Sequence, residues 1–245
     1  MNIQPKKITL NRIADVISEK FNTRDEITCY VGSNAATPTA SLEALTGAIK
    51  SRQPHLPFIK MVHLLLQGPV PYVEKGLQDR VMTYSTFSGG EVRRAANEGR
   101  AYYLPCTLAN LASLIGKGRT YEPDVVFLKV RQSDLTGEYS LGLSVEALHT
   151  AIDHAEVVIA ELDPGMPFTQ GQSVVDAQSI DFIIEEIVNK AMRVEEFYKK
   201  LTSYFEHGLE LVREKTGRNR FFLTREALVD PETFISNLIK NEIEM

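Results

Sequence analysis

Two hydrophobic patterns alternate along most of the chain. Short runs that are apolar at nearly every position are typical of strands buried on both faces of a sheet. Between them, apolar residues recur at every third or fourth position, the spacing of one helix face. The strand-like runs are 27–31, 58–66, 81–87, 124–130 and 157–162, and the helix-like segments are 13–21, 38–49, 90–99, 108–115 and 144–155. The alternation predicts an α/β fold with an open, mostly parallel sheet that helices cover on both sides.

Local signals place some of the helix boundaries. Thr37 is a favourable N-cap and Pro38 suits the first position of a helix, so one helix is expected to begin there. Gly89 and Gly90 are expected to open the next helix, and Gly99 to close it.

The pattern changes near residue 186. Segment 179–215 is helix-like and rich in charges, with no strand expected in it, and Asp230 with Pro231 is expected to begin a last helix. We therefore predict two parts, an α/β domain at 1–186 and an α-helical C-terminal appendage at 187–245. Apolar residues of 188–211 are expected to complete the appendage's own core, to cover the loop face of the domain, or to form an assembly surface.

Composition narrows the class of protein. The net charge is −5 and the isoelectric point near 5.6, which argues against nucleic acid or an anionic membrane as a partner. The first residues lack an apolar signal core, and no apolar stretch approaches the roughly 20 residues that span a bilayer. Cys29 and Cys106 lie in apolar runs and are expected to be buried free thiols. These features predict a soluble, cytoplasmic protein.

The strand-to-helix turn at 31–38 is the best candidate for a site. Gly32, Ser33, Asn34 and Ala35 are small, so a ligand could approach the backbone, and N–H groups at a helix start attract an anion or a carbonyl oxygen. The turn has neither the Rossmann nor the P-loop spacing. An ordinary capped turn between a strand and a helix explains the same residues.

The other candidate motifs are weaker. Arg93 and Arg94 follow Gly89–Gly90 and suit either phosphate binding or a solvated helix face, and the latter is favoured. Segment 163–167 follows a buried strand, where open α/β sheets place ligand loops. His149 and Asp153 are spaced to pair on a helix. The sequence has no serine-hydrolase elbow and no histidine or cysteine spacing for zinc, so neither a metal nor a catalytic residue is predicted.

Several of these stretches together resemble the N-terminal domain of the acetyl-CoA hydrolase/4-hydroxybutyrate CoA-transferase family. The resemblance runs in order through about residues 25–186, roughly three quarters of the chain. Its main parts are 32–38 (GSNAATP), 63–72 (HLLLQGPVPY), 97–105 (NEGRAYYLP), 140–145 (SLGLSV), 158–161 (VIAE) and 163–173 (DPGMPFTQGQS).

The resemblance implies a function for the loops. Enzymes of this family move coenzyme A between carboxylic acids, or release it to water, through a glutamyl-CoA thioester. Their active site lies between two similar α/β domains, and the catalytic glutamate belongs to the second. A coenzyme A thioester is therefore the implied substrate. The implied substrate-binding residues here are Gly32, Ser33, Asn34, Ala35, Ser140, Gly142 and Met166.

Two functions follow as hypotheses. The chain is half of a CoA-transferase or acyl-CoA hydrolase that lacks the second domain with the catalytic glutamate and is inactive without a partner subunit. It is expected to associate with a second CoA-transferase subunit or with copies of itself. Alternatively, it is a non-catalytic binding or scaffold protein derived from that domain. Departures from the family pattern at Tyr102, 110–113, 131–134 and Gln170 leave the substrate open.

Overall fold

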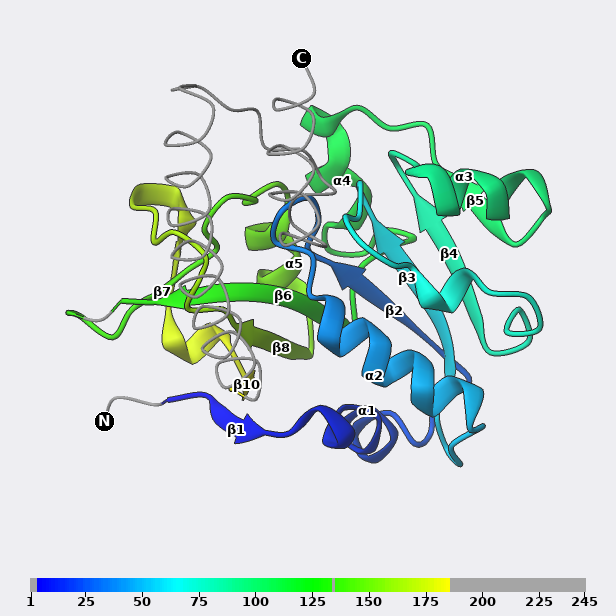
Figure 1. The fold of residues 1–245 in the computed structure, drawn as a ribbon, viewed down its shortest axis with the longest axis horizontal. Coiled ribbons are helices and arrows are strands. Elements are labelled where there is room, and N and C mark those ends of the chain that lie inside the picture. Colours follow the sequence, from blue (N-terminus) through cyan, green and yellow to red (C-terminus); the bar gives the residue numbers. More distant parts are fainter. Residues whose placement is uncertain (1–3, 134, 186–245) are drawn as a thin grey trace, which may run out of the picture. The chain divides into compact units, whose positions relative to one another are not determined.

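A computed structural model describes residues 4–133 and 135–185 (Figure 1). Its main sheet has the strand order β1-β10-β8-β6-β2-β3-β4-β5, and all neighbours in this series are parallel. Two short strands, β7 and β9, extend the end of β6 in antiparallel pairing. The strands are β1 (Lys6–Ile8), β2 (Glu26–Val31), β3 (Phe58–His63), β4 (Val81–Ser85), β5 (Ala101–Tyr103), β6 (Val125–Gln132), β7 (Tyr139–Ser140), β8 (Val157–Leu162), β9 (Val174–Val175) and β10 (Phe182–Ile184).

Helices cover both faces of the sheet. They are α1 (Ile13–Lys20), α2 (Thr39–Lys50), α3 (Gly90–Asn97), α4 (Leu111–Ile115) and α5 (Leu148–His154). Short 3₁₀ turns lie at Leu10–Arg12, Pro71–Val73, Leu108–Asn110, Gly171–Ser173 and Ala177–Ser179. Side chains of α1, α2 and α3 share one apolar core, and those of α4 and α5 share a second. In Figure 1, α2 lies in front of the strands, and α1 lies below it in the view.

The alternation of side chains along the strands explains the two cores. In β6, Phe127 belongs to the core beneath α1, α2 and α3, whereas its neighbours Val126 and Leu128 belong to the core beneath α4 and α5. All three side chains are fully buried. Because successive residues of a strand point to opposite faces, a strand covered on both sides must be apolar throughout, as the sequence pattern predicted.

The open, mostly parallel α/β fold is confirmed, but the sequence missed several short strands. Segment 179–215 was expected to contain no strand, yet β10 pairs in parallel between β1 and β8. Strands β1, β5 and β10 have only three residues each, too few to establish a periodicity. The predicted helices after residue 186 lie outside the described residues.

Two helix boundaries also differ from the prediction. The helix expected from residue 144 begins at Leu148. Thr37 does not cap α2, whose N-cap position is taken by Pro38. Instead the Thr37 hydroxyl donates to the Asn34 carbonyl at 2.8 Å and accepts from the Gln67 N–H at 3.1 Å, so this side chain ties the loop after β2 to the loop after β3.

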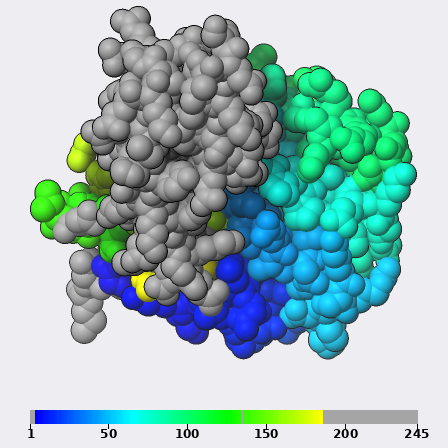
Figure 2. All heavy atoms as spheres, in the orientation of Figure 1, coloured from blue at the N-terminus to red at the C-terminus, as the bar shows by residue number. Residues whose placement is uncertain are grey.

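The space-filling view shows the same face as the ribbon (Figure 2). The blue atoms of the N-terminal segment lie next to those of α2, and the cyan to green atoms of residues 75–120 form the neighbouring surface.

Of the two cysteines, Cys29 is buried as expected, whereas Cys106 is only half-buried, since it follows the exposed edge strand β5.

Candidate functional site

The strand order defines one special position, between β2 and β6. From β2 the chain proceeds through β3 and β4 to β5 on one side, and from β6 through β8 to β10 on the other. Strands β2 and β6 are neighbours, so the loops that leave their carboxyl ends diverge toward opposite faces. In open α/β sheets, ligands bind outside the carboxyl ends of the strands at this kind of switch point. The turn after Val31, which was predicted to follow a strand, lies at this switch point.

Most backbone donors of this turn are already engaged within the protein. The Gly32 N–H donates to the Phe127 carbonyl at 2.8 Å, and the Asn34 N–H donates to the Leu65 carbonyl at 2.7 Å. Ala35 is exposed, and its N–H has no acceptor among residues 4–133 and 135–185. Among the backbone N–H groups of residues 32–37, only that of Ala35 is thus left for a ligand in the described part of the chain.

A carboxylate that the sequence did not single out holds the turn. Glu146 accepts from the Ser33 N–H at 3.1 Å, from the Ser33 hydroxyl, and from the Tyr30 hydroxyl at 3.2 Å. Burial raises the pKa of Glu146, and the bonds from Ser33 and Tyr30 partly oppose that rise. Ser33 and Tyr30 are fully buried. Glu146 therefore fixes the position of Ser33 from the loop that follows β6 and β7.

The other predicted binding residues form a second buried group. The Ser140 hydroxyl accepts from the Gly142 N–H at 3.1 Å and donates to the Thr169 carbonyl at 2.9 Å. The Thr169 hydroxyl donates to the Gly142 carbonyl at 2.7 Å. Met166 is buried against Gly142, where an added Cβ would lie 2.6 Å from the Met166 sulfur. These residues fasten the 139–142 segment to the 163–173 segment.

The seven predicted binding residues are thus divided by exposure. Gly32, Ser33, Ser140, Gly142 and Met166 are buried, Asn34 is half-buried, and Ala35 is exposed. A ligand outside the switch point could contact Asn34 and Ala35 directly. It could not contact the five buried residues, which would act only by supporting the surface that the ligand contacts. The role of all seven in substrate binding stays a prediction.

Glu161 is a second carboxylate at this end of the sheet, and it is buried. It accepts from the Ser41 N–H at the start of α2, and burial raises its pKa. Lys129 on the neighbouring strand forms an ion pair with Asp163 at 3.3 Å. Glu161 thus stabilises the helix start, where unpaired N–H groups favour a negative charge.

Large apolar side chains are exposed on loops at the carboxyl ends of the strands. Leu143 follows β7 and is 60% exposed, and Phe87 follows β4 and is 57% exposed. Tyr103 and Leu108, at the end of β5 and beyond it, are also exposed. A groove of about 640 Å³ is lined by Tyr103 and Cys106, among others. Exposed apolar surface of this kind is typical of a face that contacts another protein or domain.

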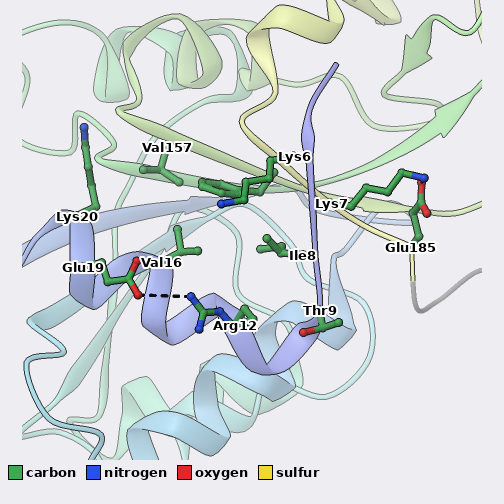
Figure 3. A pocket seen from close by; sticks show the side chains of 11 residues that line it. Lys6, Lys7, Ile8, Thr9, Arg12, Val16, Glu19, Lys20, Val157 and Glu185 are labelled. Carbon is green, nitrogen blue, oxygen red and sulfur yellow. Dashed lines mark hydrogen bonds and ion pairs between the residues drawn. The ribbon is translucent and has the colours of Figure 1, made fainter. Parts of the chain in front are cut away.

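A groove of about 750 Å³ lies at the opposite edge of the sheet, between α1 and strands β1, β8 and β10 (Figure 3). Ile8, Val16 and Val157 line its apolar part, and ion pairs such as Lys7–Glu185 and Arg12–Glu19 line its rim. None of the predicted binding residues lines this groove. Charged residues along an edge strand oppose pairing with another sheet. This role explains the charged side chains at the rim of the groove, so no ligand is needed to account for them.

Neither the proposed His149–Asp153 pair nor a metal centre is found in the described part of the chain. A ring nitrogen of His149 instead contacts the Gln172 carbonyl oxygen. No three or more His, Cys, Asp or Glu residues among those described could together hold a metal ion.

His63, at the carboxyl end of β3, gives the fold a pH dependence. Its ring is fully buried, one ring nitrogen contacts the Leu64 carbonyl at 2.9 Å, and the other has no partner among the described residues. Burial lowers its pKa from 6.5 to about 4. Since the unfolded chain then binds more protons than the folded chain at pH 4 to 6.5, this histidine makes the fold less stable as pH falls through that range.

We expect this histidine to remove about 2 kcal/mol of unfolding free energy between pH 7 and pH 5. The check is urea unfolding of the wild type and of a His63→Gln variant at both pH values. The variant should lose less stability on acidification by about that amount. Equal losses in the two proteins would show that His63 is not buried in its neutral form.

The comparisons with known proteins agree with this geometry. The acetyl-CoA hydrolase/transferase N-terminal domain family matches residues 8–207. The chain belongs to this family. The resemblance that the sequence stretches within residues 25–186 indicated is therefore confirmed. The substrates of this family are coenzyme A thioesters.

Two curated relatives match at moderate identity. A 4-hydroxybutyrate coenzyme A transferase of Clostridium kluyveri is 35% identical over 127 residues, 52% of this chain and 29% of the relative. A succinyl-CoA:acetate/propanoyl-CoA:succinate CoA transferase of Fasciola hepatica is 29% identical over 152 residues, 62% of this chain and 31% of the relative. The part of this chain that matches thus covers about a third of the length of each relative.

Solved structures confirm the fold. RipA from Yersinia pestis superposes with a TM-score of 0.61 at 20% identity, covering 74% of this chain and 42% of RipA. A 4-hydroxybutyrate CoA-transferase from Porphyromonas gingivalis gives a TM-score of 0.52 at 19% identity, covering 74% and 39% of the two chains.

Among the residues described, no helix is long and apolar enough to cross a membrane.

Proposed function

We propose that this chain supplies the N-terminal half of a CoA-transferase or acyl-CoA hydrolase. The observation that supports this most directly is the position of the family's GSNA turn. It follows β2 at the switch point of the sheet, where Asn34 and Ala35 reach the surface. A carbonyl or carboxylate oxygen placed outside this turn would find the Ala35 N–H and the Asn34 side-chain amide as donors.

The proposed reaction divides the work between two domains. A carboxylate nucleophile attacks the thioester carbonyl of an acyl-CoA, coenzyme A leaves as a thiolate, and an acyl–glutamyl anhydride remains. The thiolate then attacks the glutamyl carbonyl, which gives the glutamyl-CoA thioester and releases the acyl group as its carboxylate. The negative charge that develops on the carbonyl oxygen needs fixed donors, and this chain would contribute one from Ala35.

We further propose that the catalytic glutamate comes from a second domain on a separate polypeptide. The half-buried Glu146 and the buried Glu161 at the site edge support this, because both carboxylates accept hydrogen bonds from within the domain. The exposed Phe87, Leu108 and Leu143 supply apolar surface that such a domain would cover. A cytoplasmic location, where coenzyme A thioesters and reduced thiols occur, stays part of this proposal.

Co-purification tests the proposal. The chain is isolated from its native cells under mild conditions, and bound polypeptides are identified by mass spectrometry. The complex is then assayed for exchange of coenzyme A between acetyl-CoA and labelled carboxylates. We expect a bound polypeptide with a CoA-transferase second domain, and exchange by the complex. A chain that purifies alone and shows no exchange would contradict the proposal.

A non-catalytic binding protein is the second candidate, and one observation favours it. The N–H groups of Gly32, Ser33 and Asn34 all donate within the protein, which leaves few donors for a substrate. On this hypothesis, the co-purified complex would contain a partner without a CoA-transferase domain and would show no exchange.

A further inference from the structure

Three donors from two residues converge on the carboxylate of Glu146. One oxygen accepts both the N–H and the hydroxyl of Ser33, and the other accepts the Tyr30 hydroxyl at 3.2 Å. Ser33 follows β2, and Glu146 precedes α5, 113 residues later in the chain. The contact therefore joins the two loops that leave the switch point on opposite sides.

Two left-handed backbone conformations meet at this contact, and that of Glu146 is the less favourable, because asparagine adopts this region more readily than most residues. Glu146 has a φ of 42°, and Asn34, next to Ser33, has a φ of 53°. Residues with a side chain rarely adopt this left-handed region, and such strain persists only where surrounding contacts impose it. The bonds to Ser33 and Tyr30 supply that constraint for Glu146, and the bond from the Asn34 N–H to the Leu65 carbonyl at 2.7 Å supplies it for Asn34.

The arrangement determines which donors remain for a ligand. With Ser33 held by Glu146 and the Asn34 N–H held by Leu65, Ala35 carries the one N–H of the 32–37 turn without an acceptor in the described part of the chain. Release of Ser33 would free two further donors and allow the strained turn to relax. The Ala35 N–H would then lose its fixed direction.

We propose that Glu146 is a positioning residue, which holds the Ser33–Asn34 turn so that the Ala35 N–H is presented to the carbonyl oxygen of an acyl thioester. The part that concerns the thioester rests on the proposed function, whereas the positioning of the turn does not. Glu146 does not itself touch the reacting atoms.

Three variants of the full chain separate positioning from general stability. Glu146→Ala removes the acceptor for Ser33. Glu146→Gln retains it, because an amide oxygen accepts from Ser33 while the amide N–H₂ can donate to the Tyr30 hydroxyl. Asp124→Ala is the matched control, since Asp124 also accepts a backbone N–H, that of Thr28 at 2.7 Å, but at the amino end of the sheet.

Amide hydrogen exchange and ¹⁵N chemical shifts provide the first measurement. In Glu146→Ala, we expect the Ser33 N–H to exchange at least about tenfold faster and the Asn34 and Ala35 resonances to shift. Glu146→Gln should restore most of the protection. In Asp124→Ala, Ser33 and Ala35 should be unchanged. Unaltered Ser33 and Ala35 signals in Glu146→Ala, or the same changes in Asp124→Ala, would overturn the positioning role.

Titration with acetyl-CoA provides the second measurement. The Ala35 resonance of the wild type should shift on binding, the affinity should fall at least about fivefold in Glu146→Ala, and Glu146→Gln should recover it. Equal affinity in wild type and Glu146→Ala would overturn the thioester part. If the wild type, alone and in its native complex, does not bind acetyl-CoA, the proposed function fails, while the exchange data still decide whether Glu146 positions the turn.

Discussion

Acetyl-CoA incubated with the purified 245-residue chain and a carboxylate acceptor is expected to keep its coenzyme A. Donors can stabilise a developing negative charge, but they cannot replace the nucleophile that forms the covalent intermediate. The two carboxylates near the switch point, the half-buried Glu146 and the buried Glu161, accept hydrogen bonds from Ser33 and Ser41. We therefore expect turnover at least roughly 10³-fold below that of the chain with its second domain.

A coupled thiol assay for released coenzyme A, together with exchange of labelled acetate into acetyl-CoA, measures both reactions. The control is the same chain in its native complex, at equal concentration. Turnover by the pure chain that a single Glu→Gln change abolishes would contradict the division of labour, and it would identify a nucleophile within this chain.

Replacement of Gly142 by valine is expected to lower the free energy of unfolding by about 4 kcal/mol. Gly142 has a φ of +63°, a conformation that valine adopts only with strain. Its Cβ would also lie 2.6 Å from the sulfur of the buried Met166. Met166 would have to move, which would disturb the contact between the 139–142 and 163–173 segments.

Gly137→Val is the matched control for this variant. Gly137 has a φ of +74°, but an added Cβ there meets nothing within 4 Å. Its replacement should cost only the backbone strain, about 1–2 kcal/mol. Urea unfolding of both variants measures the difference, and Met166→Ala should partly rescue Gly142→Val. Equal losses at the two glycines would show that Met166 does not pack on Gly142.

The parts of the fold that the sequence predicted are those with long, regular patterns. The runs that became β2, β3, β4, β6 and β8 are apolar on both faces, and each needs only its own residues to be recognised. Strand β10 is different, because Phe182–Ile184 becomes a strand only by pairing with β1 and β8. A strand of three residues is stabilised by its neighbours in space, which a local pattern does not contain.

The site likewise has one part that a local pattern predicted and one part that depends on contacts between distant segments. Small residues after an apolar strand predicted the position of the turn at Ser33 and Asn34. Nothing local predicted that Glu146 would hold this turn, because the two segments are 113 residues apart and Glu146 lay within a segment expected to be helical. The late start of α5, at Leu148, leaves Glu146 in the loop and able to reach Ser33. Its left-handed φ is visible only in the structure.

The location of the covalent coenzyme A adduct tests the central claim most directly. The native complex is mixed with acetyl-CoA, quenched in acid and digested, and mass spectrometry locates the glutamyl-CoA thioester. The account predicts the adduct on a glutamate of the second domain and none on residues 1–245, with the yield reduced when Glu146 is changed to alanine. An adduct on any glutamate of this chain would contradict it.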